Sequence, residues 1–126
     1  MKRYLLILLV AGCASAPEPA PAPSAPPPLP ETPLARESVA IAGLMESARN
    51  DAATGRLVQA AGTLERALRI EPRNPRLWHE LAKVRLRQGD AAQAANLAAR
   101  SNSFAGSDSA LRAANRSIIE QSTSVR

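Results

Sequence analysis

Apolar residues recur every three or four positions through most of the chain after residue 34, and this spacing predicts helices rather than strands. The stretch 56–70 shows the pattern most clearly, with an apolar stripe formed by Leu57, Ala60, Ala61, Leu64, Ala67 and Leu68. Gly55 and Gly89 stand where glycine commonly ends a helix. Pro75 suits a first helical turn, and Asp90 can cap the helix that follows it. The pattern predicts an all-α domain with helices at about 35–53, 56–70, 75–88, 91–102 and 108–121.

The predicted helix at 75–88 carries a polar face beside its apolar stripe. Basic residues and the histidine of this face, with one arginine of the predicted helix at 35–53, are the candidate partner-binding residues: Arg49, Arg76, His79, Lys83 and Arg87. Such a row would hold an acidic segment or a C-terminal carboxylate, because a guanidinium can bind a carboxylate through two parallel hydrogen bonds. The alternative is a solvated face whose charges pair with neighbours one turn away. His79 alone is more typical of a surface histidine than of a pH switch.

Composition excludes several classes of function. The chain has 126 residues with one cysteine and one histidine, which allows one small domain but neither an internal disulfide nor a Cys/His zinc site. Carboxylates are scattered and no serine has an evident activating base, so we expect no catalysis, metal, cofactor or small-molecule substrate. Only 2% of residues are aromatic, so we expect a core of Ala and Leu with Trp78, and Met45 on a surface. Asn115 and Arg116 make the last predicted helix the most polar.

The first thirteen residues, MKRYLLILLVAGC, have the shape of a secretory signal: two basic residues, an apolar stretch and small residues. The apolar stretch is shorter than the roughly 20 residues that a membrane-spanning helix needs. The run Val10-Ala11-Gly12-Cys13 resembles the bacterial lipobox, in which the cysteine is acylated and becomes the mature N-terminus. This resemblance implies a signal peptide at 1–12 and lipidation of Cys13. The alternative is an ordinary signal peptide with a chance cysteine, against which stands the absence of any other cysteine.

The residue after the cysteine bears on the membrane that would hold the lipid. Lipoproteins retained at the inner membrane of Gram-negative bacteria commonly carry Asp there, whereas this chain has Ala14, which implies an outer-membrane anchor facing the periplasm. Loss of Lys2 and Arg3 with the signal peptide would lower the formal charge from +5 to +3. Since a periplasmic protein does not meet chromosomal DNA, we expect no nucleic-acid partner.

A proline-rich segment follows the cysteine. Nine of the eleven prolines lie between residues 14 and 33, and each removes a backbone donor and disfavours helix in its predecessor. We therefore predict a disordered, polyproline-like linker over 13–33, able to reach on the order of 60 Å at about 3.1 Å per residue. The helical domain is expected to occupy 34–126.

The helical part repeats itself at an offset of 34 residues. At this offset Gly55 pairs with Gly89, and three further pairs share size and position: Leu44 with Trp78, Ala48 with Ala82, and Ala60 with Ala94. This period, with small residues where helices cross, resembles the tetratricopeptide repeat (TPR). The chain departs from that family's pattern at Asp51 and Arg85, where a Tyr usually packs, and at Gly106, where the terminal Pro would stand. We therefore expect tandem TPR helix pairs with the last helix as a C-terminal cap.

The combination of lipobox, proline-rich linker and short TPR domain resembles the LpoP-type lipoproteins, which activate class A penicillin-binding proteins. The resemblance implies a non-catalytic adaptor that is anchored to the membrane and binds a periplasmic protein, here a peptidoglycan synthase. Pilotins for secretin or pilus systems are also TPR lipoproteins, and remain an alternative. A structural envelope lipoprotein without a client enzyme is another.

Overall fold

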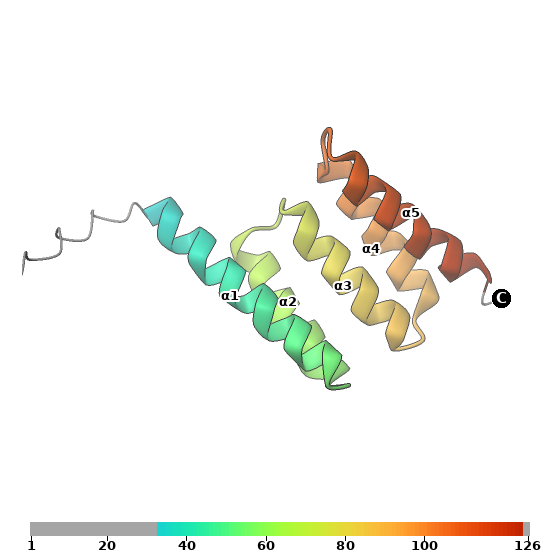
Figure 1. Cartoon of the computed structure of the whole chain (residues 1–126), viewed down its shortest axis with the longest axis horizontal. Helices are drawn as coiled ribbons and strands as arrows, with labels where there is room; N and C mark the ends of the chain where they lie inside the picture. The colour runs from blue at the N-terminus through green and yellow to red at the C-terminus, as the bar shows by residue number, and fades with distance from the viewer. Residues whose placement is uncertain (1–32, 125–126) are drawn as a thin grey trace, which may run out of the picture.

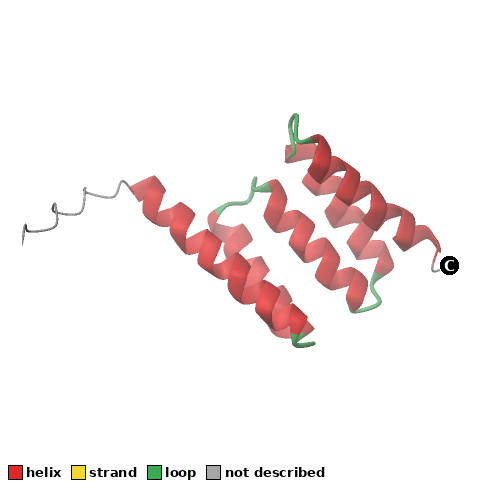
Figure 2. Ribbon diagram, viewed as in Figure 1, coloured by secondary structure: helices red, strands yellow, loops and turns green. Residues whose placement is uncertain are grey.

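The structure is a computed structural model that describes residues 33–124, with side chains described from Ser38 onward. Within this range it contains helices and no strands: α1 (Pro33–Ala53), α2 (Leu57–Ile70), α3 (Pro75–Arg87), α4 (Ala91–Phe104) and α5 (Ser109–Ser124) (Figure 2). The predicted signal peptide, Cys13 and the linker up to Thr32 lie outside the described residues. None of the described helices is both long and apolar enough to cross a bilayer.

The helices form two antiparallel pairs, α1 with α2 and α3 with α4, followed by the single helix α5 (Figure 1). The pairs join where α2 packs on α3, and α1 also touches α3. Helix α5 covers α4 and also reaches α3. This arrangement confirms the predicted all-α class, with two tandem helix pairs and a C-terminal helix that caps the second.

The helix ends lie where the sequence predicts turns. Gly55 and Gly89 adopt φ angles of 80° and 85°, a left-handed conformation that glycine tolerates best. The side chain of Asn74 accepts a hydrogen bond from the backbone nitrogen of Arg76 at 3.0 Å and so caps α3, which begins at Pro75. Asp90 caps α4 in the same way through the backbone N–H of Gln93, as predicted for this residue.

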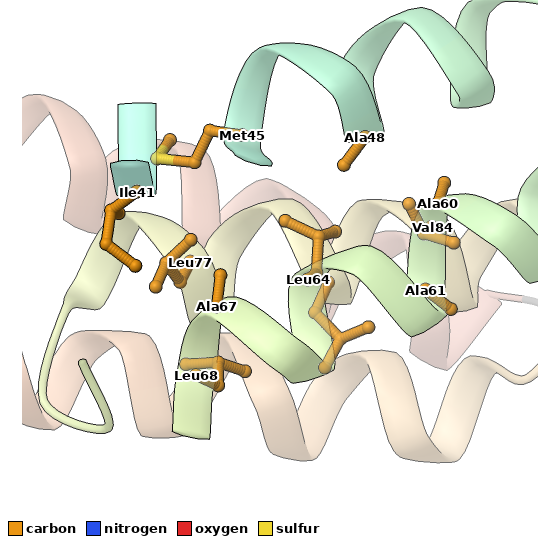
Figure 3. Close-up of a cluster of buried hydrophobic side chains, with 11 residues drawn as sticks. Ile41, Met45, Ala48, Ala60, Ala61, Leu64, Ala67, Leu68, Leu77 and Val84 are labelled. Carbon is orange, nitrogen blue, oxygen red and sulfur yellow. The ribbon is translucent and has the colours of Figure 1, made fainter. Parts of the chain in front are cut away.

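The main core lies between α1, α2 and α3, and Figure 3 shows its buried side chains. Leu64 and Leu77 are its largest fully buried members, and Ala60 and Ala67 are closed off from solvent where helices cross. The expectation that Met45 lies on a surface is wrong, because its side chain is buried in this core. The reason is that Met45 shares the face of α1 that carries Ile41 and Ala48, and that whole face packs inward.

A second, smaller core joins α3, α4 and α5 and is built from Ala82, Ala94, Ala98 and Ile118. Asn115 lies fully buried on the same helix as Ile118. The prediction treats Asn115 as one of the polar residues that set α5 apart, whereas the structure uses it as an interior hydrogen-bonding residue. A buried amide is stable only when its polar atoms find partners, and those partners lie on α3 and α4.

Trp78 lies at the edge of the main core and is only partly buried. Its ring packs against the core residues, its Nε1 donates to the carbonyl oxygen of Pro72 at 2.8 Å, and the guanidinium of Arg100 stands 4.7 Å from the ring centre. The predicted core role of Trp78 is therefore confirmed in part, because the ring packs on the main core but is not fully buried. The Arg100 guanidinium from α4 adds a cation–π contact to this ring.

Candidate partner-binding groove

A hollow of about 290 Å³ lies between α1, α3 and α5, and we call it the inner groove. The residues that line it are Arg49 from α1, Arg76, His79 and Glu80 from α3, Asp108 from the turn before α5, and Ala110, Leu111 and Ala114 from α5. Its α1 and α3 walls are therefore charged or polar, whereas the α5 wall is mostly apolar.

Glu80 is the most buried charged residue of the inner groove. Its Oε1 accepts hydrogen bonds from Nε and Nη2 of Arg49 at 3.1 and 2.9 Å, and its Oε2 accepts one from Nζ of Lys83 at 3.1 Å. Burial alone would raise the pKa of Glu80, but the hydrogen bonds and positive charges of Lys83 and Arg49 outweigh it and lower the pKa below its ordinary value. Glu80 is therefore a fixed negative charge that holds two of the predicted binding residues.

Arg76 and Asp108 face each other at the end of the groove where α5 begins. Nη2 of Arg76 lies 3.8 Å from Oδ2 of Asp108, and the Arg76 side chain is 70% exposed. Asp108 Oδ1 accepts from the backbone nitrogen of Leu111 at 3.0 Å, so this carboxylate also caps α5. Because the ion pair is long and open to solvent, Arg76 remains accessible to a partner.

His79 is joined to α5 through Asn115. The Nδ1 atom of His79 lies 2.7 Å from Oδ1 of Asn115. The Nδ2 atom of Asn115 donates to Oγ of Ser101 and to Oδ1 of Asn102, both at 2.8 Å. Oγ of Ser101 in turn donates to the carbonyl oxygen of Pro75 at 2.7 Å. The histidine is thus one end of a hydrogen-bonded chain that crosses α3, α4 and α5.

The predicted site residues divide into three groups in the structure. Arg49, Arg76 and His79 line the inner groove, and Lys83 lies beside it on Glu80. Arg87 lies apart from the groove lining, at the last turn of α3, where its Nη1 donates to the carbonyl oxygen of Ala52 at 2.6 Å. The guanidinium of Arg87 therefore ties the C-terminal ends of α1 and α3 together.

The groove residues that come from α5 and from the turn before it are absent from the predicted site. Sequence reasoning treats α5 as a cap, and Asp108, Leu111 and Ala114 carry no signal of binding beyond their place on one helical face. Asp108 alone could have been found, because an Asp just before an apolar stripe is typical of a helix cap. Its position opposite Arg76 follows only from the packing of α5 against α3.

The charges of the inner groove nearly balance, since Arg49 and Arg76 face Glu80 and Asp108. An acidic partner segment would have to compete with these two carboxylates, so the groove is selective rather than strongly basic. Among the described residues, no group of three or more His, Cys, Asp and Glu side chains is placed to hold a metal ion. A polar wall, an apolar wall and an accessible arginine together suit a segment of a protein.

Comparisons with known proteins agree with this architecture. The tetratricopeptide repeat family matches residues 51–117. A solved structure, the globular C-terminal domain of P. aeruginosa LpoP, is 42% identical in sequence, with a TM-score of 0.66, and the match covers 67% of this chain and 79% of that one. No protein with a curated description matches the chain significantly. The chain therefore belongs to the tetratricopeptide repeat family and is an LpoP-like member of it.

Proposed function

We propose that the chain is a lipid-anchored periplasmic adaptor that binds a class A penicillin-binding protein and activates it. The observation that carries this proposal is the 42% identity to the LpoP domain, over a match that covers 67% of this chain. The TPR fold is a protein-interaction scaffold, and the inner groove provides a partly polar, partly apolar surface for a partner.

Anchoring is proposed to occur through Cys13. The run Val10-Ala11-Gly12-Cys13 supports acylation of this cysteine, and several acyl chains on one residue anchor a protein stably where a single chain does so only marginally. Ala14 supports retention at the outer membrane. The proline-rich linker would then hold the helical domain away from the membrane surface and toward its partner.

The anchor and the groove have separate tasks in this proposal. Attachment to the membrane raises the effective concentration of the domain near the synthase, which strengthens binding without any new contact. Activation needs more than proximity, because a ligand shifts an enzyme toward an active conformer only when it binds that conformer better. We therefore place the activating contact in the inner groove and the enrichment in the lipid and linker.

Charge reversal at the accessible arginine tests the proposal. Arg76→Glu should weaken binding to a purified class A penicillin-binding protein about tenfold or more, since it replaces the open cation of the groove with a charge that repels Asp108 and an acidic partner. Arg69→Glu, on the exposed side of α2, makes the same charge change away from the groove and should bind like the natural chain.

The two variants and the natural chain give distinct outcomes. Binding lost in Arg76→Glu alone, with unchanged helical circular dichroism, supports the groove. Equal binding by all three chains would remove the groove from the proposal while leaving the partner. A natural chain that neither binds the synthase nor raises its glycan polymerisation would refute the activator function, and recovery of a secretin from envelope extract would point to a pilotin instead.

A further inference from the structure

The hydrogen-bonded chain that ends at His79 has a fixed direction, because it begins at a group that can only accept. The carbonyl oxygen of Pro75 has no proton, so the Ser101 hydroxyl must give its proton to that oxygen. The Ser101 oxygen, with its proton used, must then accept from Asn115, which places the amide NH₂ of Asn115 on this side. The carbonyl oxygen of Asn115 consequently faces His79 and can only accept from it.

This direction decides which nitrogen of His79 carries the proton. Since Oδ1 of Asn115 is an acceptor 2.7 Å from Nδ1, the neutral imidazole must be protonated at Nδ1. Its Nε2 is then a lone-pair acceptor. No residue in the described part of the chain makes a hydrogen bond to Nε2, although His79 is one of the residues that line the inner groove. The fold therefore places an acceptor of defined tautomer beside the groove.

The surroundings of His79 restrict what can use this acceptor. The guanidinium of Arg49 is held by Glu80, and Arg76, although accessible, has the Asp108 carboxylate beside it, so each nearby cation already has a carboxylate near it. The wall contributed by Leu111 and Ala114 is apolar. A small anion would find few unmatched charges here, whereas a stretch of extended polypeptide offers both a backbone N–H and an apolar side chain.

We propose that Nε2 of His79 accepts a hydrogen bond from an N–H or O–H of an extended partner segment, whose apolar side chain rests on Leu111 and Ala114. Asn115 is the positioning residue that fixes the tautomer and the ring, and α5 is thereby a wall of the binding site as well as a cap. The inference rests on the proposed adaptor function only because it requires a protein partner. It does not depend on which protein that partner is.

Two substitutions of His79 separate its two nitrogens. His79→Asn retains an amide near the position of Nδ1, which can still donate to Asn115, but has no atom at the position of Nε2. His79→Gln places an amide near the position of Nε2 and can supply the acceptor there. We expect His79→Asn to weaken partner binding about five- to tenfold, the usual value of one hydrogen bond, and His79→Gln to recover a substantial part of that loss.

The experiment uses the full lipidated chain, tagged without histidines and solubilised in detergent, as bait in envelope extract. The natural chain, His79→Asn and His79→Gln are compared for the proteins they retain, and thermal unfolding of each bait shows that all three are folded. A penicillin-binding synthase retained by the natural chain and by His79→Gln, but reduced with His79→Asn, supports both proposals. The same dependence for a different protein supports the role of His79 and overturns the synthase as partner.

Two other outcomes overturn the inference. Equal retention of the synthase by all three baits would leave the adaptor function standing and remove His79 from the binding surface. The second is spectroscopic and needs no partner: because the chain has a single histidine, ¹⁵N–¹H correlation of its ring reports this one tautomer. A neutral ring protonated at Nε2 rather than Nδ1 would contradict the deduced hydrogen-bond direction, and with it the proposal.

Discussion

Glu80 illustrates how one carboxylate shapes the inner groove. It lies on α3, and its two oxygens are shared between Arg49 on α1 and Lys83 one turn further along α3. The side chain of Glu80 is 12% exposed, so its charge is poorly solvated and depends on these two partners. At the scale of single residues, the groove is therefore held in shape by an ion pair that spans the two helix pairs.

Replacement of this carboxylate should have a measurable cost. Glu80→Gln is expected to lower the free energy of unfolding at pH 7 by about 1–2 kcal/mol, because the neutral amide makes weaker hydrogen bonds to Arg49 and Lys83. Glu65→Gln is a matched control, since Glu65 is more exposed and, among the described residues, forms an ion pair with Arg85 alone, and should cost less than about 1 kcal/mol. Urea unfolding followed by circular dichroism measures both.

The pH dependence of this difference follows from the lowered pKa of Glu80. A carboxyl whose pKa is lower in the folded chain stabilises the fold fully above its unfolded value, about 4.5, and the stabilisation disappears as the pH falls through the folded value. The gap between the natural chain and Glu80→Gln should therefore be largest near neutral pH and shrink below about pH 4.5. A gap that grew on acidification would contradict the assigned ion pairs.

At the scale of helices, the turns depend most directly on the backbone conformation of single residues. Gly55 and Gly89 both have positive φ, and both stand at the turn inside a helix pair. Space does not constrain either glycine, since a Cβ built on each would meet no atom within 4 Å. Their role is therefore conformational, and it recurs at the 34-residue offset because each helix pair needs the same left-handed residue.

Two Gly→Ala substitutions distinguish backbone conformation from packing. Gly89→Ala should destabilise the fold by about 1 kcal/mol, because alanine at positive φ is strained. Gly62→Ala lies inside α2 with equally open surroundings, and should stabilise the fold by about 0.5–1 kcal/mol through helix propensity. Thermal unfolding of both variants measures the two signs. Equal effects of the two substitutions would mean that the turn conformation has been assigned wrongly.

The same scale shows which parts of the fold could be predicted. Helices and their pairing follow from signals that are local and repeated, such as the stripe of α2 and the two turn glycines. The burial of Met45 and Asn115 could not be obtained in this way, because it depends on which face of α1 and α5 meets a distant helix. From sequence alone Asn115 is expected at the surface, and its burial is explained only by its partners on α3 and α4.

The same contrast between local sequence signals and long-range packing applies to the candidate site. Arg49, Arg76 and His79 share the inner faces of successive first helices, and helical spacing together with the repeat offset is enough to bring them together. The periodicity also includes Arg87 on that row, although the structure turns its guanidinium to the end of α1. The α5 wall could not be inferred, since it depends on an unrepeated helix taking the place of a third first helix.

At the scale of the whole molecule, the proposal joins a lipid, a linker and a binding domain in series. The sequence of the linker matters if it sets distance, because a polyproline-like chain of about 20 residues reaches on the order of 60 Å. A Gly/Ser chain of equal length behaves as a random coil with a typical end-to-end distance of only about 25 Å. Two linkers of equal length but different composition therefore differ in reach, so the effect of reach can be tested at constant length.

Replacing residues 15–32 with a Gly/Ser segment of equal length should impair the chain in cells while leaving its affinity for the purified synthase unchanged. Cys13 and Ala14 are kept, so the run that resembles a lipobox and the residue after it remain intact. The shorter typical reach would place the domain within range of its partner less often, which lowers the effective concentration. Growth at increasing β-lactam concentration tests the proposed activation in the cell, and purified components measure affinity.

Two further chains give this last prediction its controls. A linker with the same residues in scrambled order retains the prolines and should behave like the natural chain. Cys13→Ala should leave an unlipidated precursor that takes up no fatty-acid probe and lacks function in the cell, which sets the lower limit. If the Gly/Ser chain protects cells as well as the natural one while Cys13→Ala does not, the anchor is needed but extension of the linker is not.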